Sequence, residues 1–152
     1  MLTFDELRRI CFTHDAYLVG GGARYVVGKL MEARAHLGVL PVQEVFAGLK
    51  DATPHDWDVL VEGELPTIFD ELYTFTKFGG RRYTRLDLDI WQGSIGKYLR
   101  NVHLHEKCLA VHLETGVVLG THEFFLGYSG HTGRGTHVPK YCDDRFVLPR
   151  KP

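Results

Sequence analysis

The chain has 152 residues, 44% of them hydrophobic and 24% charged, and its formal net charge is −1. This length is typical of one domain that buries its own core, and the near-zero charge excludes a general attraction to nucleic acid or anionic lipid. No apolar run is long enough to span a membrane, and the N-terminus lacks the apolar stretch of a secretion signal. We therefore expect a cytoplasmic protein with no membrane contact, in which any polyanion is bound by a local patch.

The segment 2–12 predicts a short amphipathic helix, because Thr3 and Glu6 have capping-box spacing and apolar residues then recur on one helical face. The next segment, "AYLV" at 16–19, has the character of a short apolar strand. It runs into the glycine turn 20–22, after which the helical spacing of 23–38 follows. The order is strand, glycine turn, helix.

The middle of the chain predicts a short helix within 42–50 and a strand in "DWDVLVEG" at 56–63. The stretch 65–78 has Pro66 at a plausible first helical position and apolar residues at helical spacing, so we expect a helix packed on a sheet. Residues 81–91 alternate in polarity, which predicts one strand with an apolar and a charged face.

The last third predicts a short helix or turn at 94–102 and two strands, 108–114 and 116–120, joined at the dipeptide Thr115-Gly116. A last helical turn is expected at 121–128. The segment 129–152 is rich in Gly, Pro, His and basic residues without periodicity, which indicates an extended tail. The predicted fold is therefore one α/β (mixed α+β) domain, a small mixed sheet flanked by helices, over residues 1–128, followed by a tail over 129–152.

Two pairs of aspartates stand out. Asp56 and Asp58 point to the same face of their strand, as do Asp87 and Asp89, because side chains alternate along a strand. If the strands are neighbours, four like charges converge, and a cation must offset their repulsion. Carboxylate oxygens suit Mg²⁺, with Mn²⁺ as the alternative, and a metal pair of this kind supports phosphoryl transfer. The competing interpretation is that these acids only keep strand edges soluble.

The glycine turn provides a second candidate feature. Gly20, Gly21 and Gly22 allow backbone N–H groups to approach an anion where a helix begins, and the helix dipole favours negative charge there. A phosphate group is the expected ligand, although a tight strand-to-helix turn alone also explains the glycines.

Taken in order, "LVGGGAR", "DWDVLV" and "LDLDIW" resemble the nucleotidyltransferase superfamily, in particular the head domain of poly(A) polymerases and CCA-adding tRNA nucleotidyltransferases. The resemblance covers residues 16 to about 120 and implies an NTP-dependent, Mg²⁺-dependent enzyme. The implied catalytic and metal-binding residues are Asp56, Asp58 and Asp89, with Asp87 as the alternative third carboxylate. The implied nucleotide-binding residues are Gly20, Gly21, Gly22 and Arg24.

The resemblance implies transfer of a nucleoside monophosphate from an NTP to a hydroxyl acceptor, with release of pyrophosphate. An RNA or tRNA 3′ end is the first expectation for the acceptor, and a protein side chain or a small molecule is the alternative. Two departures separate the chain from CCA-adding enzymes: Tyr25 stands where they have an aspartate, and the connection from Arg24 to Asp56 is longer than theirs. We also expect no counterpart of their tRNA-binding domains, so the resemblance does not identify the acceptor.

Two rival functions remain open at this stage. One is a catalytically inactive nucleotidyltransferase fold that binds a nucleotide or a partner protein, and the other is a plain α+β binding domain. The basic residues beside the second acidic pair either hold a triphosphate or nucleic-acid backbone or form a solvated face; they are Arg81, Arg82, Arg85 and Lys97. Trp91 and Tyr98 either stack on a base or belong to the core.

The cysteines and histidines do not indicate a metal centre. Cys11, Cys108 and Cys142 are far apart and form no Cys-x-x-Cys pair, so we expect reduced thiols in the core. None of the nine histidines has the spacing of a known zinc helix or knuckle.

Overall fold

A computed structural model describes residues 2–37, 41–53, 56–68, 70–77, 79–101, 109–121 and 147–148. In chain order its elements are α1 (Phe4–Cys11), β1 (Ala16–Val19), α2 (Gly20–Leu37), α3 (Val42–Gly48), β2 (Trp57–Val61), β3 (Thr74–Phe75), β4 (Arg81–Tyr83), the 3₁₀ helix η1 (Thr84–Leu86), β5 (Leu88–Gln92), α4 (Ile95–Asn101), β6 (Leu109–His112), β7 (Val118–Thr121) and β8 (Val147–Leu148).

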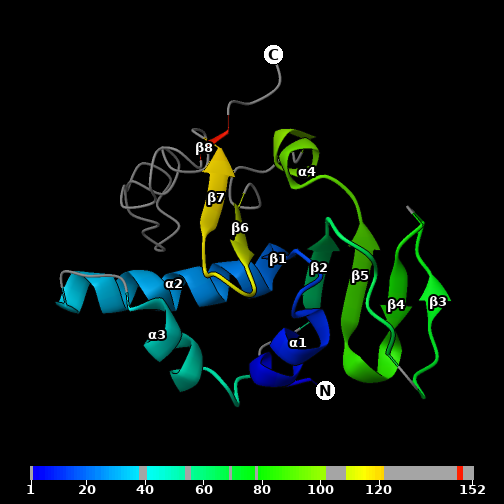
Figure 1. Ribbon diagram of the computed structural model, residues 1–152, viewed down its shortest axis with the longest axis horizontal. Helices are drawn as coiled ribbons and strands as arrows, with labels where there is room; N and C mark the ends of the chain where they lie inside the picture. Colours follow the sequence, from blue (N-terminus) through cyan, green and yellow to red (C-terminus); the bar gives the residue numbers. More distant parts are fainter. Residues whose placement is uncertain are drawn as a thin grey trace.

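The strands form one eight-stranded sheet in the order β3-β4-β5-β2-β1-β6-β7-β8. The pairs β2/β5 and β7/β8 are parallel, and the other neighbours are antiparallel. Figure 1 shows strands β5, β4 and β3 extending to one side of the molecule, while the long helix α2 extends to the other. The sheet is mixed and carries helices, which confirms the predicted α/β class.

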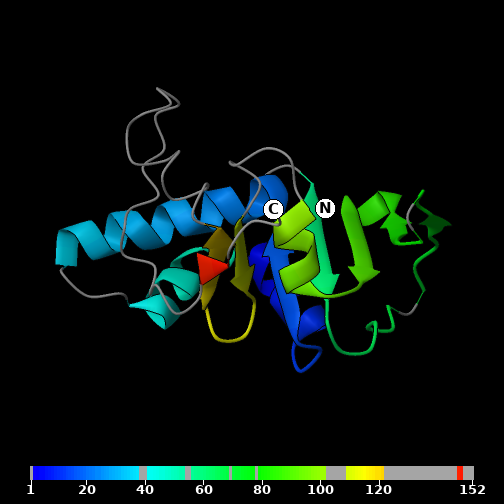
Figure 2. The same cartoon turned by 90° about the horizontal axis from the view of Figure 1, so that it is seen from above.

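The two faces of the sheet are buried differently. On β2, Trp57, Val59 and Val61 belong to the larger core, which also contains apolar residues of α1, α2 and α3. The alternate residue Leu60 belongs to a smaller core on the opposite face, where α4 packs through Ile95 and Leu99. Viewed from above, α2 and α3 lie towards one end of the molecule and β3 and β4 towards the other (Figure 2).

Local sequence explains how the first helix begins. The Thr3 hydroxyl accepts a hydrogen bond from the Glu6 N–H, and the Glu6 carboxylate accepts one from the Thr3 N–H, which confirms the predicted capping box. Helix α1 then places Phe4, Leu7 and Cys11 in the core. Burial raises the pKa of the Cys11 thiol to about 12, so it remains protonated. Cys108 and Cys142 lie outside the described residues.

The predicted helix over 65–78 is wrong. The described part of this stretch is largely irregular and contains only the two-residue strand β3. Two of its apolar residues explain the error, because Leu72 is 88% exposed and Phe75 73% exposed. Their helical spacing does not mark a buried face, and tertiary pairing of β3 with β4 determines the structure instead.

The single strand predicted over 81–91 is in fact an antiparallel pair, β4 and β5, joined by η1. Asp87 ends η1 with a φ of 51°, a left-handed conformation that aspartate adopts more readily than most residues. The chain therefore reverses just before β5. Arg85 and Asp87 consequently do not lie on a strand with Asp89 and Trp91.

Other predictions hold where the structure describes them. The helices within 42–50 and 94–102 form as α3 and α4, and strands β6 and β7 join through the Thr115-Gly116 turn. The helical turn expected at 121–128 falls outside the described residues, as does the tail except for β8, which pairs with β7. In the described part of the chain, no helix is long and apolar enough to cross a membrane.

Trp57, which separates Asp56 from Asp58, should anchor the acidic strand. It is fully buried, and its indole N–H donates to the Leu2 carbonyl at 2.9 Å. We expect Trp57→Phe to lower the free energy of unfolding by about 1–3 kcal/mol, because a buried carbonyl loses its partner and a cavity forms. Urea denaturation measures this, with the half-buried Trp91→Phe as the control. An equal or larger loss in the control would contradict the assignment.

Candidate metal and nucleotide site

A row of residues crosses the centre of the sheet and changes from apolar to charged. Val19 on β1 is opposite Asp58 on β2, Asp58 is opposite Asp89 on β5, and Asp89 is opposite Arg82 on β4. Residues in register on neighbouring strands point to the same face and are about 5 Å apart. The sheet thus brings together two carboxylates from segments that are distant in sequence.

Burial and like charge act together on Asp58. The pKa of its carboxyl group is raised to about 6, and burial is the largest cause. The neighbouring carboxylates of Asp89 and Asp56 and a hydrogen bond to Asp89 contribute to this rise, whereas the Arg82 guanidinium opposes it. The site therefore strongly favours a positive charge or a proton beside Asp58.

Arg82 supplies that positive charge in the present structure. Its Nη2 lies 3.2 Å from Asp87 Oδ1 and 3.7 Å from Asp56 Oδ1, and its Nη1 lies 3.5 Å from Asp89 Oδ2. The sequence marks Arg82 only as one of several basic residues near the second acidic pair, and these ion pairs are not predictable from it. They depend on the chain reversal at η1, which the alternating polarity of 81–91 concealed.

The glycine turn lies directly against the acidic pair. Gly20 has a φ of 68°, and a Cβ added to it would be 2.8 Å from Asp58 Oδ2. This close approach sets the start of α2 beside the Asp58 carboxylate. Gly21 is exposed and has open space around it, while a Cβ on Gly22 would be 2.9 Å from the Trp57 ring. Helix-to-sheet packing accounts for Gly22, and Gly21 is the glycine accessible to a ligand.

The remaining predicted site residues do not pair across strands with Asp58 or Asp89. Asp56 precedes β2 and is 58% exposed at its side chain, and Asp87 faces Arg82 from the end of η1. Arg24 is half-buried near the start of α2. Within the described residues, no three His, Cys, Asp or Glu side chains are grouped closely enough to hold a metal ion. The structure thus places Asp58 in register with Asp89, whereas Asp56 and Asp87 form ion pairs with Arg82.

The basic and aromatic residues that were candidates for nucleotide or nucleic-acid binding have different surroundings from Arg82. Arg81 lies on the opposite sheet face from Arg82, and its guanidinium is 4.7 Å from the ring centre of Tyr73. Arg85 and Lys97 are exposed. Trp91 and Tyr98 contact each other with ring centres 6.1 Å apart and border the smaller core, as the core interpretation expects.

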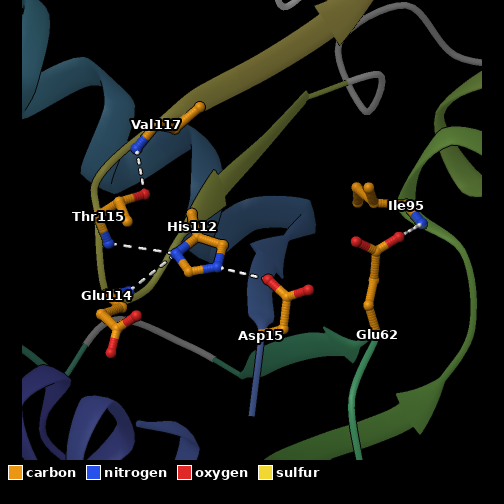
Figure 3. Close-up of polar contacts among 7 residues, drawn as sticks. All are labelled: Asp15, Glu62, Ile95, His112, Glu114, Thr115 and Val117. Atoms are coloured by element: carbon orange, nitrogen blue, oxygen red, sulfur yellow. Dashed lines mark hydrogen bonds and ion pairs between the residues drawn. The ribbon is translucent and has the colours of Figure 1, made fainter. Parts of the chain in front are cut away.

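His112 has a structural role, as Figure 3 shows. Its Nδ1 accepts from the N–H groups of Glu114 and Thr115 at 3.3 and 3.2 Å, so Nε2 carries the proton and donates to Asp15 Oδ1 at 2.8 Å. This imidazole therefore fixes the β6–β7 turn. In the same view, the Glu62 carboxylate at the end of β2 accepts from the Ile95 N–H at the start of α4 (Figure 3).

Comparison of the chain with protein-family models, curated proteins and solved structures yields no match.

Gly20 and Gly21 should respond differently to substitution by alanine. Gly20→Ala places a Cβ against Asp58 and forces a left-handed conformation on alanine, so we expect a loss of about 1–3 kcal/mol in the free energy of unfolding. Gly21→Ala meets no atom within 4 Å and should be neutral or slightly stabilising. Urea denaturation of both variants checks this, and equal losses would disprove the proposed close approach.

The raised pKa of Asp58 predicts that the site weakens the fold at neutral and alkaline pH. The folded state binds the Asp58 proton more tightly than the unfolded state, so stability from this group is present below about pH 4 and is lost as pH rises through about 6. Asp58→Asn removes this dependence. Relative to wild type, it should gain about 3 kcal/mol between about pH 4 and pH 8.

Urea denaturation in chelator-containing buffer across this pH range measures the difference. The matched control is Asp51→Asn, which removes the same charge from an exposed position after α3. A stability difference between Asp58→Asn and wild type that does not change with pH would show that the Asp58 carboxyl is not desolvated.

Proposed function

We propose that the protein is a metal-dependent nucleotidyltransferase that moves a nucleoside monophosphate from an NTP to a hydroxyl acceptor and releases pyrophosphate. The observation that carries this proposal is the pairing of Asp58 with Asp89 in parallel register, directly beside the start of α2 at Gly20. The resemblance of the three motifs to nucleotidyltransferase head domains supports it. The proposal includes a cytoplasmic location, where NTPs and Mg²⁺ are available.

The acidic pair suits a divalent cation. The Asp89 carboxylate lies beside that of Asp58 and raises the pKa of Asp58, and Asp89 Oδ1 is buried with no hydrogen-bond partner among the described residues. Mg²⁺, or Mn²⁺ in its place, would be held by Asp58 and Asp89, with Asp56 or Asp87 as further ligands. When bound, such ions activate the attacking hydroxyl and stabilise the leaving phosphate in an in-line displacement.

The chain's own groups would bind and orient the nucleotide. The N–H groups at Gly20 and Gly21 would hold the triphosphate at the positive end of α2, with Arg24 one turn further along that helix. Asp58 and Asp89 would fix the orientation of the reacting phosphate relative to the acceptor hydroxyl. An RNA or tRNA 3′ end is the first acceptor to test, followed by protein side chains and small molecules.

One observation favours a second function. Arg82 pairs with three of the four aspartates, which is the arrangement of a site stabilised without metal. The second candidate is therefore a catalytically inactive nucleotidyltransferase fold that binds a nucleotide or a partner protein.

The deciding experiment is a transfer assay with each NTP labelled at its α-phosphate. The protein is incubated with Mg²⁺ or Mn²⁺ and with tRNA, total RNA or cell protein as acceptor. We expect wild type to transfer label and Asp58→Asn to lose at least about a hundredfold in rate, because a few kcal/mol of transition-state stabilisation are removed.

Asp51→Asn is the matched control and should retain wild-type transfer. Because Asp58→Asn is expected to be more stable than wild type near neutral pH, unfolding would not explain its loss of activity. Transfer that survives in Asp58→Asn would disprove the mechanism. Nucleotide binding without transfer to any acceptor would favour the inactive module.

A further inference from the structure

We propose that Arg82 is a positioning residue that holds the place of a divalent cation at Asp89 and moves to the triphosphate when a metal–nucleotide complex binds. The inference rests on the proposed function and deepens it, because it names the residue that couples metal binding to nucleotide binding.

The contacts of Arg82 are those of a counter-ion that can be exchanged. Its nitrogens lie 3.2–3.7 Å from carboxylate oxygens of Asp56, Asp87 and Asp89, which come from two stretches of the chain distant in sequence. Tight arginine–carboxylate hydrogen bonds are usually about 2.7–2.9 Å long. Arg82 donates one hydrogen bond, to Asp87, and its contacts with Asp56 and Asp89 are longer ion pairs, so its contact with Asp89 is one that a cation could replace.

A cation and Arg82 compete for the same carboxylate. Asp89 presents Oδ2 to Arg82, and Asp89 is also the residue in register with Asp58. A divalent cation shared by Asp58 and Asp89 would lie beside the guanidinium, and like charges at such short range repel strongly in a partly buried site. Metal binding alone therefore requires Arg82 to give up Asp89 without gaining a new partner, and it then keeps only its contacts with Asp56 and Asp87.

A bound nucleotide would provide that partner. The start of α2 follows directly from β1, and Arg82 lies on β4, at the other end of the row that crosses β1, β2, β5 and β4. Three strand spacings separate the two ends, which is about 14 Å. An extended triphosphate and an arginine side chain together span this distance. The planar guanidinium binds phosphate oxygens through paired hydrogen bonds, so the released arginine gains an anion as the metal arrives.

The first test measures Mn²⁺ binding by calorimetry without nucleotide. We expect Arg82→Gln to bind Mn²⁺ on the order of tenfold more tightly than wild type, because a competing positive charge is removed. The matched control is Arg85→Gln, which removes the same charge from the exposed neighbouring element η1 and should bind as wild type does.

The second test measures binding of a non-hydrolysable NTP analogue at saturating Mn²⁺. Here we expect the opposite sign: Arg82→Gln binds the analogue several-fold more weakly than Arg85→Gln, because it cannot contact the phosphates. Thermal unfolding provides a readout that is independent of the nucleotide. In buffer with chelator, the melting temperature of Arg82→Gln should be lower than that of Arg85→Gln. Added Mn²⁺ should raise the melting temperature of Arg82→Gln by more than it raises that of Arg85→Gln.

If Arg82→Gln does not fold, Arg82→Lys replaces it. This variant keeps the charge and loses the paired donors, so Mn²⁺ affinity should match wild type while analogue affinity falls. Equal Mn²⁺ affinity in Arg82→Gln and Arg85→Gln would overturn the placeholder role. Tighter Mn²⁺ binding with unchanged analogue affinity would overturn the transfer to phosphate. Both outcomes leave the proposed function standing, whereas failure of wild type to bind Mn²⁺ or the analogue would overturn it and this inference together.

Discussion

The repulsion between two carboxylates that the sheet holds side by side is the constraint on which the candidate site of this protein depends. Asp58 and Asp89 cannot separate, because the parallel pairing of β2 with β5 fixes both backbones and the apolar neighbours Trp57, Val59 and Ile90 bury the other face. The protein therefore has to supply a proton, an internal cation or a bound ion at this point. A residue pair chosen only for stability would not be acidic, since a buried charge costs free energy unless it is paired.

The same constraint explains why the neighbouring backbone is glycine. A side chain at Gly20 would occupy the position of the Asp58 carboxylate, and one at Gly22 would meet Trp57. Strand β1, the start of α2 and the acidic strand are therefore fitted to one another as a unit. Arg82 completes this unit from the opposite side, through a strand that follows β2 by 20 residues in the sequence.

Much of this arrangement follows from local sequence patterns. The capping box of Thr3 and Glu6, the strand before the glycines and the period-two placement of Asp56 and Asp58 each depend on near neighbours, which is why they could be predicted. The stretch from Leu65 to Lys77 could not, because Leu72 and Phe75 are exposed although they have helical spacing, and the one strand in its described part exists through pairing with β4. The chain reversal at Asp87 could not be predicted either, because the same alternation of polar and apolar residues is expected for one long strand and for two strands joined by a short turn. The ion pairs of Arg82 depend on that reversal.

The parallel pairing of β2 with β5 also bears on how the chain folds. Parallel neighbours cannot be joined by a tight turn, so the two acidic segments meet only after the intervening residues, including β3 and β4, have been accommodated at the sheet edge. Contacts of such wide sequence separation carry a high loop-closure entropy and slow the folding of the regions that contain them. The hairpin of β6 and β7 is local by comparison. The acidic pair is thus assembled by long-range closure of the sheet, and a chain that has formed only its local elements has no such pair.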